Sequence, residues 1–351
     1  MTEVSTIGLD LAKSVFQVHG VDKCGKVLIV RQLRRSEVSK FFGKLPPCLV
    51  GMEACATAHF WARELSALGH SVRLMPANYV KPYVKRSKTD AADAAAICEA
   101  VTRPTMRFVA AKSSEQQANL MFHRTRDMLV KTRTGLVNAL RGHLAEFGIV
   151  AAVGLPKVKD LVAVVMDETE PRLPPMARTA LTSVVAQLES LQAEINKLEG
   201  MIVARHRADA TSLRLASIPG IGPIIASALV ATITNPKAFK SGRDLAAWIG
   251  LVPRQNSSGG KEKSGGISKQ GDRYLRSLLV VGATAVLRHL KQKSRPEAVW
   301  LKSLLERRPF KVVAIALANK MARVAWALMT KGGLYRGSRI TADAGVMPAA
   351  A

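Results

Sequence analysis

The chain has 351 residues, and 48% of them are hydrophobic, which is enough to fill the cores of two domains joined by a connector. Its 52 basic and 26 acidic residues give a formal net charge of +26, which favours a polyanionic partner, most commonly nucleic acid. The basic residues are spread along the chain instead of flanking one amphipathic segment, and the sequence shows neither a signal peptide nor a membrane span, so we expect a cytoplasmic protein without a membrane partner.

Strand-like and helix-like patterns alternate over the first hundred residues. We predict three consecutive strands, then two strands that alternate with helices, and this order is typical of a ribonuclease-H-like mixed sheet. The helices are expected at 36–44, capped by Ser36, and at 58–68. The strands are expected at 6–10, 15–19, 26–33, 49–52 and 71–75. We assign residues 1–112 to this α/β domain.

Residues 113–210 are expected to form long helices that connect two domains. After a proline-rich break at 171–175, apolar residues recur at alternating spacings of three and four, as in a coiled-coil seam. The seam residues are Leu181, Val184, Leu188, Leu191, Ile195, Leu198 and Ile202. A helix of an ordinary bundle would also fit, but we favour paired helices, within or between subunits, because Glu and Lys flank the seam.

A second, mainly helical domain is expected at residues 211–332, followed at 333–351 by a small, polar tail that we expect to be disordered. The stretch 218–225 fits the hairpin of a helix-hairpin-helix motif, in which Gly220 and Gly222 would expose backbone N–H groups to DNA phosphates. An ordinary glycine-broken turn between helices is the alternative. We favour the DNA-binding interpretation because small residues follow the hairpin and allow close packing.

Four carboxylates in the first domain have the pattern of a metal site. Asp10 and Glu53 end predicted strands, and Asp90 and Asp93 lie three residues apart on one face of a helix. In a ribonuclease-H-like sheet these positions converge on one edge, where carboxylates could hold one or two Mg²⁺ ions for phosphodiester chemistry. Taken singly, each would more often be a turn residue or a helix cap. Basic residues that suit phosphate groups stand just upstream, at Lys85, Arg86 and Lys88.

A loop rich in glycine, serine and lysine is expected at 254–272. Its glycines would let the backbone approach a phosphate closely, as in anion-binding nests, and a serine hydroxyl there could attack a phosphodiester if a base or metal activated it. The residue pattern leaves a flexible turn, a phosphate-binding loop and a nucleophile all open. The surrounding basic residues that we expect to contact nucleic acid are Arg254, Lys261, Lys263, Lys269, Arg273 and Arg276.

Four blocks together resemble the DEDD insertion-sequence transposases, which are bridge-RNA-guided recombinases, and the related Piv-type DNA invertases. The blocks are Gly8-Leu9-Asp10, Met52-Glu53-Ala54, Lys88 to Asp93 and Gly250 to Arg276. The resemblance covers about residues 4–330. It implies a RuvC-like N-terminal domain that binds Mg²⁺ through the four carboxylates, and a C-terminal transposase domain whose serine forms a covalent phosphoserine link to DNA. The match to the family's Ser-Gly pair places that serine at Ser258, with the adjacent Ser257 as the alternative.

The resemblance also implies the partners: donor and target DNA, a structured guide RNA from the element, and further copies of the chain, as a dimer that assembles into a tetramer on DNA. In such an assembly the carboxylates of one subunit act with the serine of another. One rival function is a RuvC-like endonuclease that uses water as its nucleophile, and another is a non-catalytic nucleic-acid-binding protein. Because a nuclease would need only the carboxylates, the serine loop separates a recombinase from a nuclease.

Overall fold

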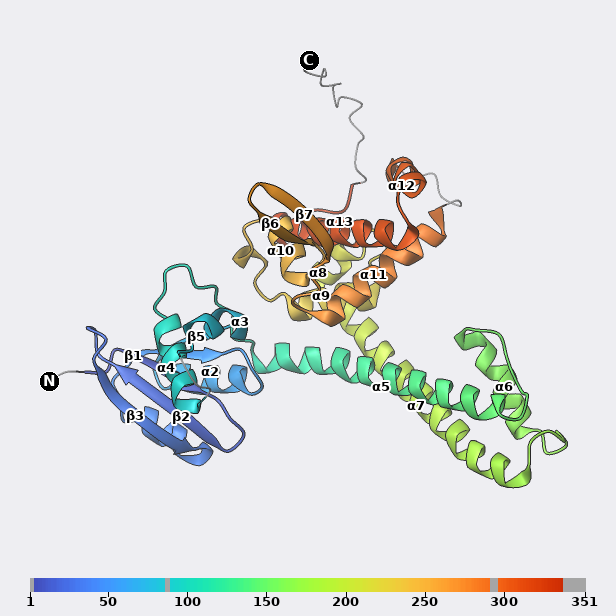
Figure 1. Ribbon diagram of the computed structural model, residues 1–351, viewed down its shortest axis with the longest axis horizontal. Coiled ribbons are helices and arrows are strands. Elements are labelled where there is room, and N and C mark those ends of the chain that lie inside the picture. The colour runs from blue at the N-terminus through green and yellow to red at the C-terminus, as the bar shows by residue number, and fades with distance from the viewer. Residues whose placement is uncertain (1–2, 86–88, 291–295, 337–351) are drawn as a thin grey trace, which may run out of the picture. The chain divides into compact units, whose positions relative to one another are not determined.

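The computed structural model describes residues 3–85, 89–290 and 296–336 of the chain (Figure 1). The chain divides into two compact units, Met1–Ala118 and Asn119–Ala351. The domain boundaries expected at 112, 210 and 332 stay predictions.

The first unit is built on a five-stranded mixed sheet. Its strands, in the order β3-β2-β1-β4-β5, are β1 (Thr6–Asp10), β2 (Val15–Val21), β3 (Val27–Arg34), β4 (Leu49–Glu53) and β5 (Ser71–Met75). The β1–β2 and β2–β3 pairs are antiparallel, whereas the β1–β4 and β4–β5 pairs are parallel. This topology confirms the predicted ribonuclease-H-like α/β fold.

Helices pack on both faces of the sheet, because successive strand residues point to opposite faces. On one face, α1 (Val38–Phe42) and α2 (Ala58–Ala67) share a core with Leu9 and Met52. On the other face, α4 (Asp90–Ala100) lies directly on the backbone of β1 at Gly8, where an added Cβ would be 2.1 Å from the carbonyl oxygen of Ala94. Two short helices, α3 (Ala77–Val80) and η2 (Lys81–Tyr83), come between β5 and α4 in the chain.

The helix predicted at 36–44 is only partly formed. A 3-10 turn, η1 (Arg35–Glu37), precedes the five-residue α1, so the prediction that Ser36 caps the helix was wrong. Instead, the Glu37 carboxylate accepts the backbone N–H of Arg34 at 2.7 Å, which ties the last residue of β3 to the turn.

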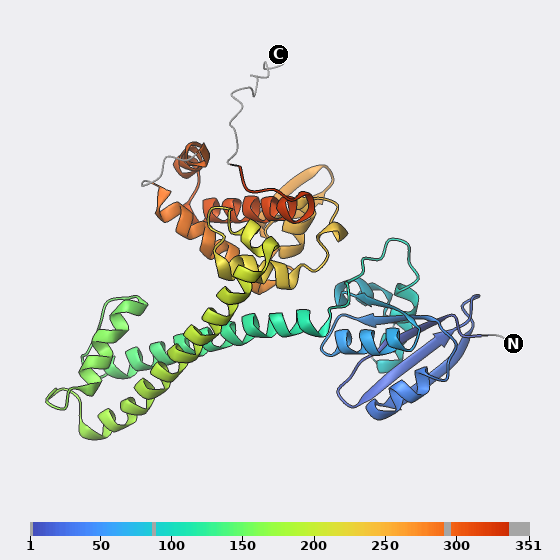
Figure 2. The same cartoon turned by 180° about the vertical axis from the view of Figure 1, so that it is seen from behind.

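Two long helices, α5 (Ser114–Ala145) and α7 (Pro175–Ala208), run antiparallel, as the two opposite views show (Figures 1 and 2). Arg126 Nε donates to Glu199 at 2.7 Å and Arg133 donates to Gln192 at 2.6 Å, which fixes the direction of the pair. A short turn, η3 (Leu155–Lys157), and α6 (Val158–Met166) lie in the connection between them.

The predicted seam of α7 is the buried side of this helix. Leu181, Leu188, Ile195 and Ile202 are buried, and the other three seam residues are half-buried. At the far end, Leu181 and Leu188 join a core with residues of α5 and α6. The seam of α7 therefore packs against a helix of the same chain, α5. That the two helices wind into a coiled coil stays a prediction.

The remaining part of the second unit is mainly helical, as predicted. Its helices are α8 (Ala210–Leu215), α9 (Pro223–Thr232), η4 (Pro236–Ala238), α10 (Gly242–Ile249), α11 (Arg273–Arg288), α12 (Pro296–Arg307) and α13 (Phe310–Lys331). By length and composition α13 could cross a membrane, but its buried side joins Leu245 and Leu279 in the core, as in a central helix of a globular domain.

The prediction of a loop at 254–272 is wrong over most of that range. Residues Pro253–Ser258 (β6) and Lys261–Ile267 (β7) form an antiparallel hairpin. The reason is the Gly259-Gly260 pair, whose φ angles of 56° and 75° meet the requirement for positive φ in a two-residue hairpin turn. The polar composition that resembled a loop belongs to a ribbon whose described side chains are nearly all exposed.

The chain after α13 has no regular structure over residues 332–336. The backbone N–H of Tyr335 donates to Ser217 Oγ at 3.0 Å, so this stretch packs back against the turn between α8 and α9. The remainder of the tail predicted to be disordered, residues 337–351, lies outside the described residues.

Candidate active site

Asp10 and Glu53 lie side by side at one edge of the sheet. They are the last residues of the parallel strands β1 and β4, whose register pairs Leu9 with Met52 one residue earlier. Both follow a glycine by two residues, Gly8 and Gly51, and therefore point to the same face of the sheet as these glycines. This is the face that α4 covers.

Helix α4 brings its first turn to the same edge. Gly8 lies against Ala94 and Cys98 of α4, and the Cys98 thiol is 3.7 Å from the carbonyl oxygen of Thr6, further back on β1. The helix therefore runs antiparallel to β1, and its N-terminal end lies beside the end of the strand.

Thr89 begins α4 by accepting the backbone N–H of Ala92 at 3.2 Å, as a helix cap does. The two aspartates follow directly in the first turn: Asp90 is exposed and Asp93 is half-buried. The cap residue is thus Thr89, which leaves the carboxylates of both aspartates available for another purpose than capping.

The electrostatics of Glu53 link it to two of the other carboxylates, Asp10 and Asp93. Burial raises the pKa of the Glu53 carboxyl, and the negative charges of Asp10 and Asp93 raise it further. Each of the three side chains is about half-buried, so water screens their repulsion only partly. Like charges at reduced solvent exposure disfavour one another's ionised form, and a bound cation would offset that repulsion.

The donor set fits Mg²⁺ in its chemistry, since carboxylate oxygens are the hard ligands that this ion prefers. Within the described residues, no three His, Cys, Asp or Glu side chains stand close enough together to hold a metal ion without adjustment. If these carboxylates hold an ion, side chains such as Asp90, which is exposed at the helix start, would have to rotate toward it.

The basic residues expected beside the carboxylates are only partly described. Lys85 is exposed, and its Nζ lies 4.0 Å from the carboxylate of Glu99. Arg86 and Lys88 lie outside the described residues.

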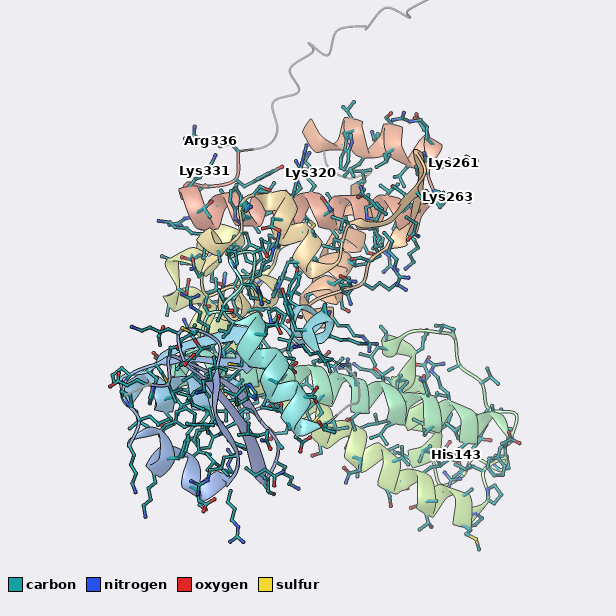
Figure 3. All side chains as sticks on the ribbon, turned by 60° about the vertical axis from the view of Figure 1, so that its left-hand side comes forward. His143, Lys261, Lys263, Lys320, Lys331 and Arg336 are labelled. Carbon is teal, nitrogen blue, oxygen red and sulfur yellow. The ribbon has the colours of Figure 1, made fainter. Side chains whose placement is uncertain are left out.

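The second candidate group lies on the β6–β7 hairpin. Ser258 is the last residue of β6 and pairs with Lys261 across the two-residue turn, and Asn256 pairs with Lys263. These four residues therefore lie on one face of the ribbon, with directly opposite Cβ atoms about 5 Å apart. Lys261 and Lys263 lie at the outside of this part of the protein (Figure 3). Ser257 points to the opposite face, away from this pair of lysines.

The base of the hairpin is held by Arg276. Its guanidinium donates to the carbonyl oxygens of Ile249 at 2.7 Å and Gln270 at 2.9 Å. The backbone is tightly packed here, because a Cβ on Gly271 would be 1.7 Å from the carbonyl oxygen of Trp248. Arg276 thus bridges the end of α10 and the segment that follows β7, and its predicted contact with nucleic acid stays a prediction.

The other basic residues predicted around this hairpin are exposed. They are Arg254, Lys261, Lys263, Lys269 and Arg273. Among them Lys269 has a positive φ of 56°, and its backbone N–H donates to the carbonyl oxygen of Gly250. Their contact with nucleic acid stays a prediction.

The two glycines of the predicted helix-hairpin-helix differ in their surroundings. Gly220, with a φ of 87°, lies against the backbone of Gly282 on α11, so its small size serves the packing of α11. Gly222 is exposed with open space around it, directly before α9. Of the two, Gly222 therefore has the surroundings that a phosphate contact needs, and the motif stays a prediction.

Sequence reasoning missed a buried polar cluster that joins α5 to the C-terminal helices. His123 of α5 lies 3.3 Å from the Tyr274 hydroxyl and 3.1 Å from the Ser227 hydroxyl. Burial, with a contribution from the charge of Arg126, lowers the pKa of His123 to about 4. No local signal marks a lone histidine in a long polar helix, because its partners are more than a hundred residues away in sequence.

Comparisons with known proteins match both parts of the chain. A profile of DEDD transposases, described as "Transposase", matches residues 7–149, which include the four carboxylates. A second profile, described as "Transposase IS116/IS110/IS902 family", matches residues 212–297, which include the hairpin with Ser258.

Three similar proteins are transposases by name, and the alignments cover almost the whole chain. "Probable family 20 transposase" of Pseudomonas aeruginosa is 52% identical over 95% of this chain and 99% of its own. "Transposase for insertion sequence element IS1328" of Yersinia enterocolitica is 42% identical over 95% and 99%. "Transposase for insertion sequence element IS1111A" of Coxiella burnetii is 40% identical over 96% and 92%.

Proposed function

Because the chain belongs to the IS116/IS110/IS902 transposase family, whose members are DNA-processing enzymes, we propose that it moves an insertion sequence by metal-dependent recombination in which Ser258 becomes covalently linked to DNA. The observation that carries this proposal is the placement of Ser258: it is exposed at the end of a strand, beside a glycine turn and opposite Lys261. A serine in an ordinary flexible turn would have no fixed cationic neighbour.

We assign the metal to Asp10, Glu53, Asp90 and Asp93, as one or two Mg²⁺ ions. The closeness of Asp10 and Asp93 to Glu53 supports this, since both raise the pKa of the Glu53 carboxyl and a bound cation would offset their repulsion. When bound, the metal would neutralise charge on the phosphate and favour the ionised form of the attacking hydroxyl. The role of the chain itself would be to hold the carboxylates in place, through the packing of α4 on Gly8 and of Val101, the residue after α4, on Gly51.

The serine step conserves the phosphodiester energy. Ser258 Oγ forms a bond to phosphorus while the bond from phosphorus to a deoxyribose oxygen breaks, the serine proton passes to a base, and the leaving oxygen takes up a proton. A deoxyribose hydroxyl of another strand then attacks the phosphoserine and releases Ser258, so that strands are exchanged without ATP. Lys261 and Lys263, on the face of Ser258, supply positive charge for the phosphate.

The partners that we propose are donor DNA, target DNA and a structured guide RNA from the element, in the bacterial cytoplasm. The net charge of +26 supports long polyanionic partners such as DNA and RNA. We also propose that the protein forms a dimer that assembles into a tetramer on DNA, with the carboxylates of one subunit acting beside Ser258 of another. The placement of the two groups in separate compact units of the chain is compatible with such an exchange.

The test is the covalent protein–DNA adduct, which resists denaturation and migrates more slowly on a denaturing gel. Ser258→Ala should abolish the adduct, whereas Ser257→Ala, the matched control on the opposite face of the strand, should retain it. Glu53→Gln should abolish both the adduct and strand cleavage. If Ser258→Ala still cleaves DNA at the rate of the unaltered protein, water is the nucleophile, and the protein is a RuvC-like endonuclease instead.

A further inference from the structure

A groove that no part of the proposed chemistry uses lies on the first unit. It has a volume of about 630 Å³ and opens to solvent. Its lining residues come from the β1–β2 turn, the end of β3 and the start of α2: Lys13, Ser14, Arg34, Arg35, Phe60 and Trp61 are the ones that matter here.

The groove is electropositive. Lys13 and Arg34 are exposed, and among the residues that the structure describes no carboxylate lies within ion-pair distance of Lys13, Arg34 or Arg35. The carboxylate of Glu37, three residues after Arg34, accepts the backbone N–H of Arg34, and its single negative charge leaves the group of Lys13, Arg34 and Arg35 with a net positive charge. Cations held together without a carboxylate partner form a site for an anion.

The groove is also aromatic. Phe60 is 41% exposed as a residue, and its ring stands at 80° to the Trp61 ring, with centroids 5.2 Å apart. The Arg35 guanidinium lies 5.4 Å from the centre of the Trp61 ring, which holds this cation at the groove wall.

The groove lies at the same edge of the sheet as the carboxylates. The turn that contains Lys13 begins just after Asp10, and Arg34 ends the strand two positions away from β1 in the sheet. Phe60 and Trp61 belong to α2, on the opposite face from α4. A strand of nucleic acid that passes the carboxylates can therefore continue around the edge of the sheet into the groove.

We propose that this groove binds a single strand of nucleic acid, with the phosphates on Lys13, Arg34 and Arg35 and an unpaired base on the Phe60 ring. A single strand is favoured because an exposed ring can stack only on a base that is not already stacked in a duplex. The proposal rests on the proposed function only for the direction of the strand, toward the carboxylates, since binding in the groove needs neither Ser258 nor a metal.

The test is the affinity of the full-length protein for three labelled probes of arbitrary sequence, about twenty nucleotides or base pairs long: single-stranded DNA, single-stranded RNA and duplex DNA, measured by fluorescence anisotropy without divalent metal. Phe60→Ala should weaken single-strand binding about tenfold and duplex binding hardly at all. Lys13→Gln with Arg34→Gln should lower the slope of log K against log salt by about 1.4, because each phosphate of a single strand that the protein neutralises adds about 0.7 to that slope.

The matched control is Lys23→Gln with Lys26→Gln, which removes two exposed charges from the opposite end of the same β2–β3 hairpin. If the control variant and the groove variant lost equal affinity for the single strand, the proposal would be overturned, because the loss would reflect only the change in net charge. A loss of duplex binding by Phe60→Ala as large as that of single-strand binding would overturn it too. Stronger groove-dependent binding of RNA assigns the groove to RNA, and stronger binding of DNA assigns it to a displaced DNA strand.

Two further readouts keep this test separate from that of the proposed function. Melting curves show whether each variant is folded. Nucleic-acid affinities are compared only among variants that melt at the temperature of the unaltered protein. The adduct assay is run on the same variants: loss of adduct in Ser258→Ala with intact single-strand binding separates the two proposals, whichever of them fails.

Discussion

Replacement of Gly8 by alanine tests whether the packing of α4 on β1 holds the carboxylate site together. The added Cβ would be 2.1 Å from the carbonyl oxygen of Ala94 and 2.4 Å from the backbone nitrogen of Cys98, and real Cβ atoms essentially never come within 3.0 Å of another heavy atom. Both obstacles are backbone atoms that cannot rotate away, so α4 must move by roughly 1 Å. Overpacking of this kind should lower the free energy of unfolding by about 3 kcal/mol.

The assay is thermal unfolding, followed by a magnesium titration of the folded variant. A loss of about 3 kcal/mol should lower the melting temperature of the first unit by more than about 10 °C. The matched control is Gly135→Ala on α5, where a Cβ meets nothing within 4 Å and alanine should stabilise the helix by about 0.5–1 kcal/mol. If Gly8→Ala unfolded at the temperature of the unaltered protein and bound magnesium equally well, the inferred contact between α4 and β1 would be wrong.

Three more predictions concern single groups. Folding raises the pKa of the Glu53 carboxyl, so the free energy of unfolding of the metal-free protein should fall as the pH rises through that pKa. Asp93→Asn should lower the pKa of Glu53 in a titration followed by NMR, and an unchanged pKa would contradict the shared site. Folding lowers the pKa of His123 from 6.5 to about 4, so its contribution to the free energy of unfolding, up to about 3 kcal/mol, should be present above pH 6.5 and lost as the pH falls toward 4. His123→Gln should flatten this pH dependence in urea unfolding, and an equally steep curve would argue against a buried neutral histidine. Arg276→Ala should cost about 1–3 kcal/mol by orphaning the carbonyl oxygens of Ile249 and Gln270, whereas a wild-type melting curve with weaker DNA binding would mean that Arg276 contacts nucleic acid instead.

The sheet and the edge that carries the carboxylates could be predicted from the sequence because their signals are local. Strands 6–10, 49–53 and 71–75 are short apolar runs bounded by turns or helices, and the structure has them within a residue of the prediction. Once the ribonuclease-H-like order was inferred, the ends of β1 and β4 had to lie side by side. The convergence of Asp10 and Glu53 follows from that topology.

Contacts between distant parts of the chain could not be predicted. The packing of Gly220 on Gly282, the clamp made by Arg276 and the partners of His123 each depend on how helices meet in space. The hairpin was missed for another reason: its strands are polar on both faces, so the alternation that identifies a half-buried strand is absent, and only the Gly259-Gly260 turn indicates it.

Peptide mapping of the trapped adduct tests most directly whether Ser258 becomes bonded to DNA. The unaltered protein would be incubated with DNA of the element ends and Mg²⁺, quenched with denaturant and digested, and the nucleotide-bearing peptide sequenced by mass spectrometry. We predict a phosphodiester-linked nucleotide on Ser258. A nucleotide on any other residue, or complete cleavage of the DNA with no nucleotide on the protein, would contradict the account.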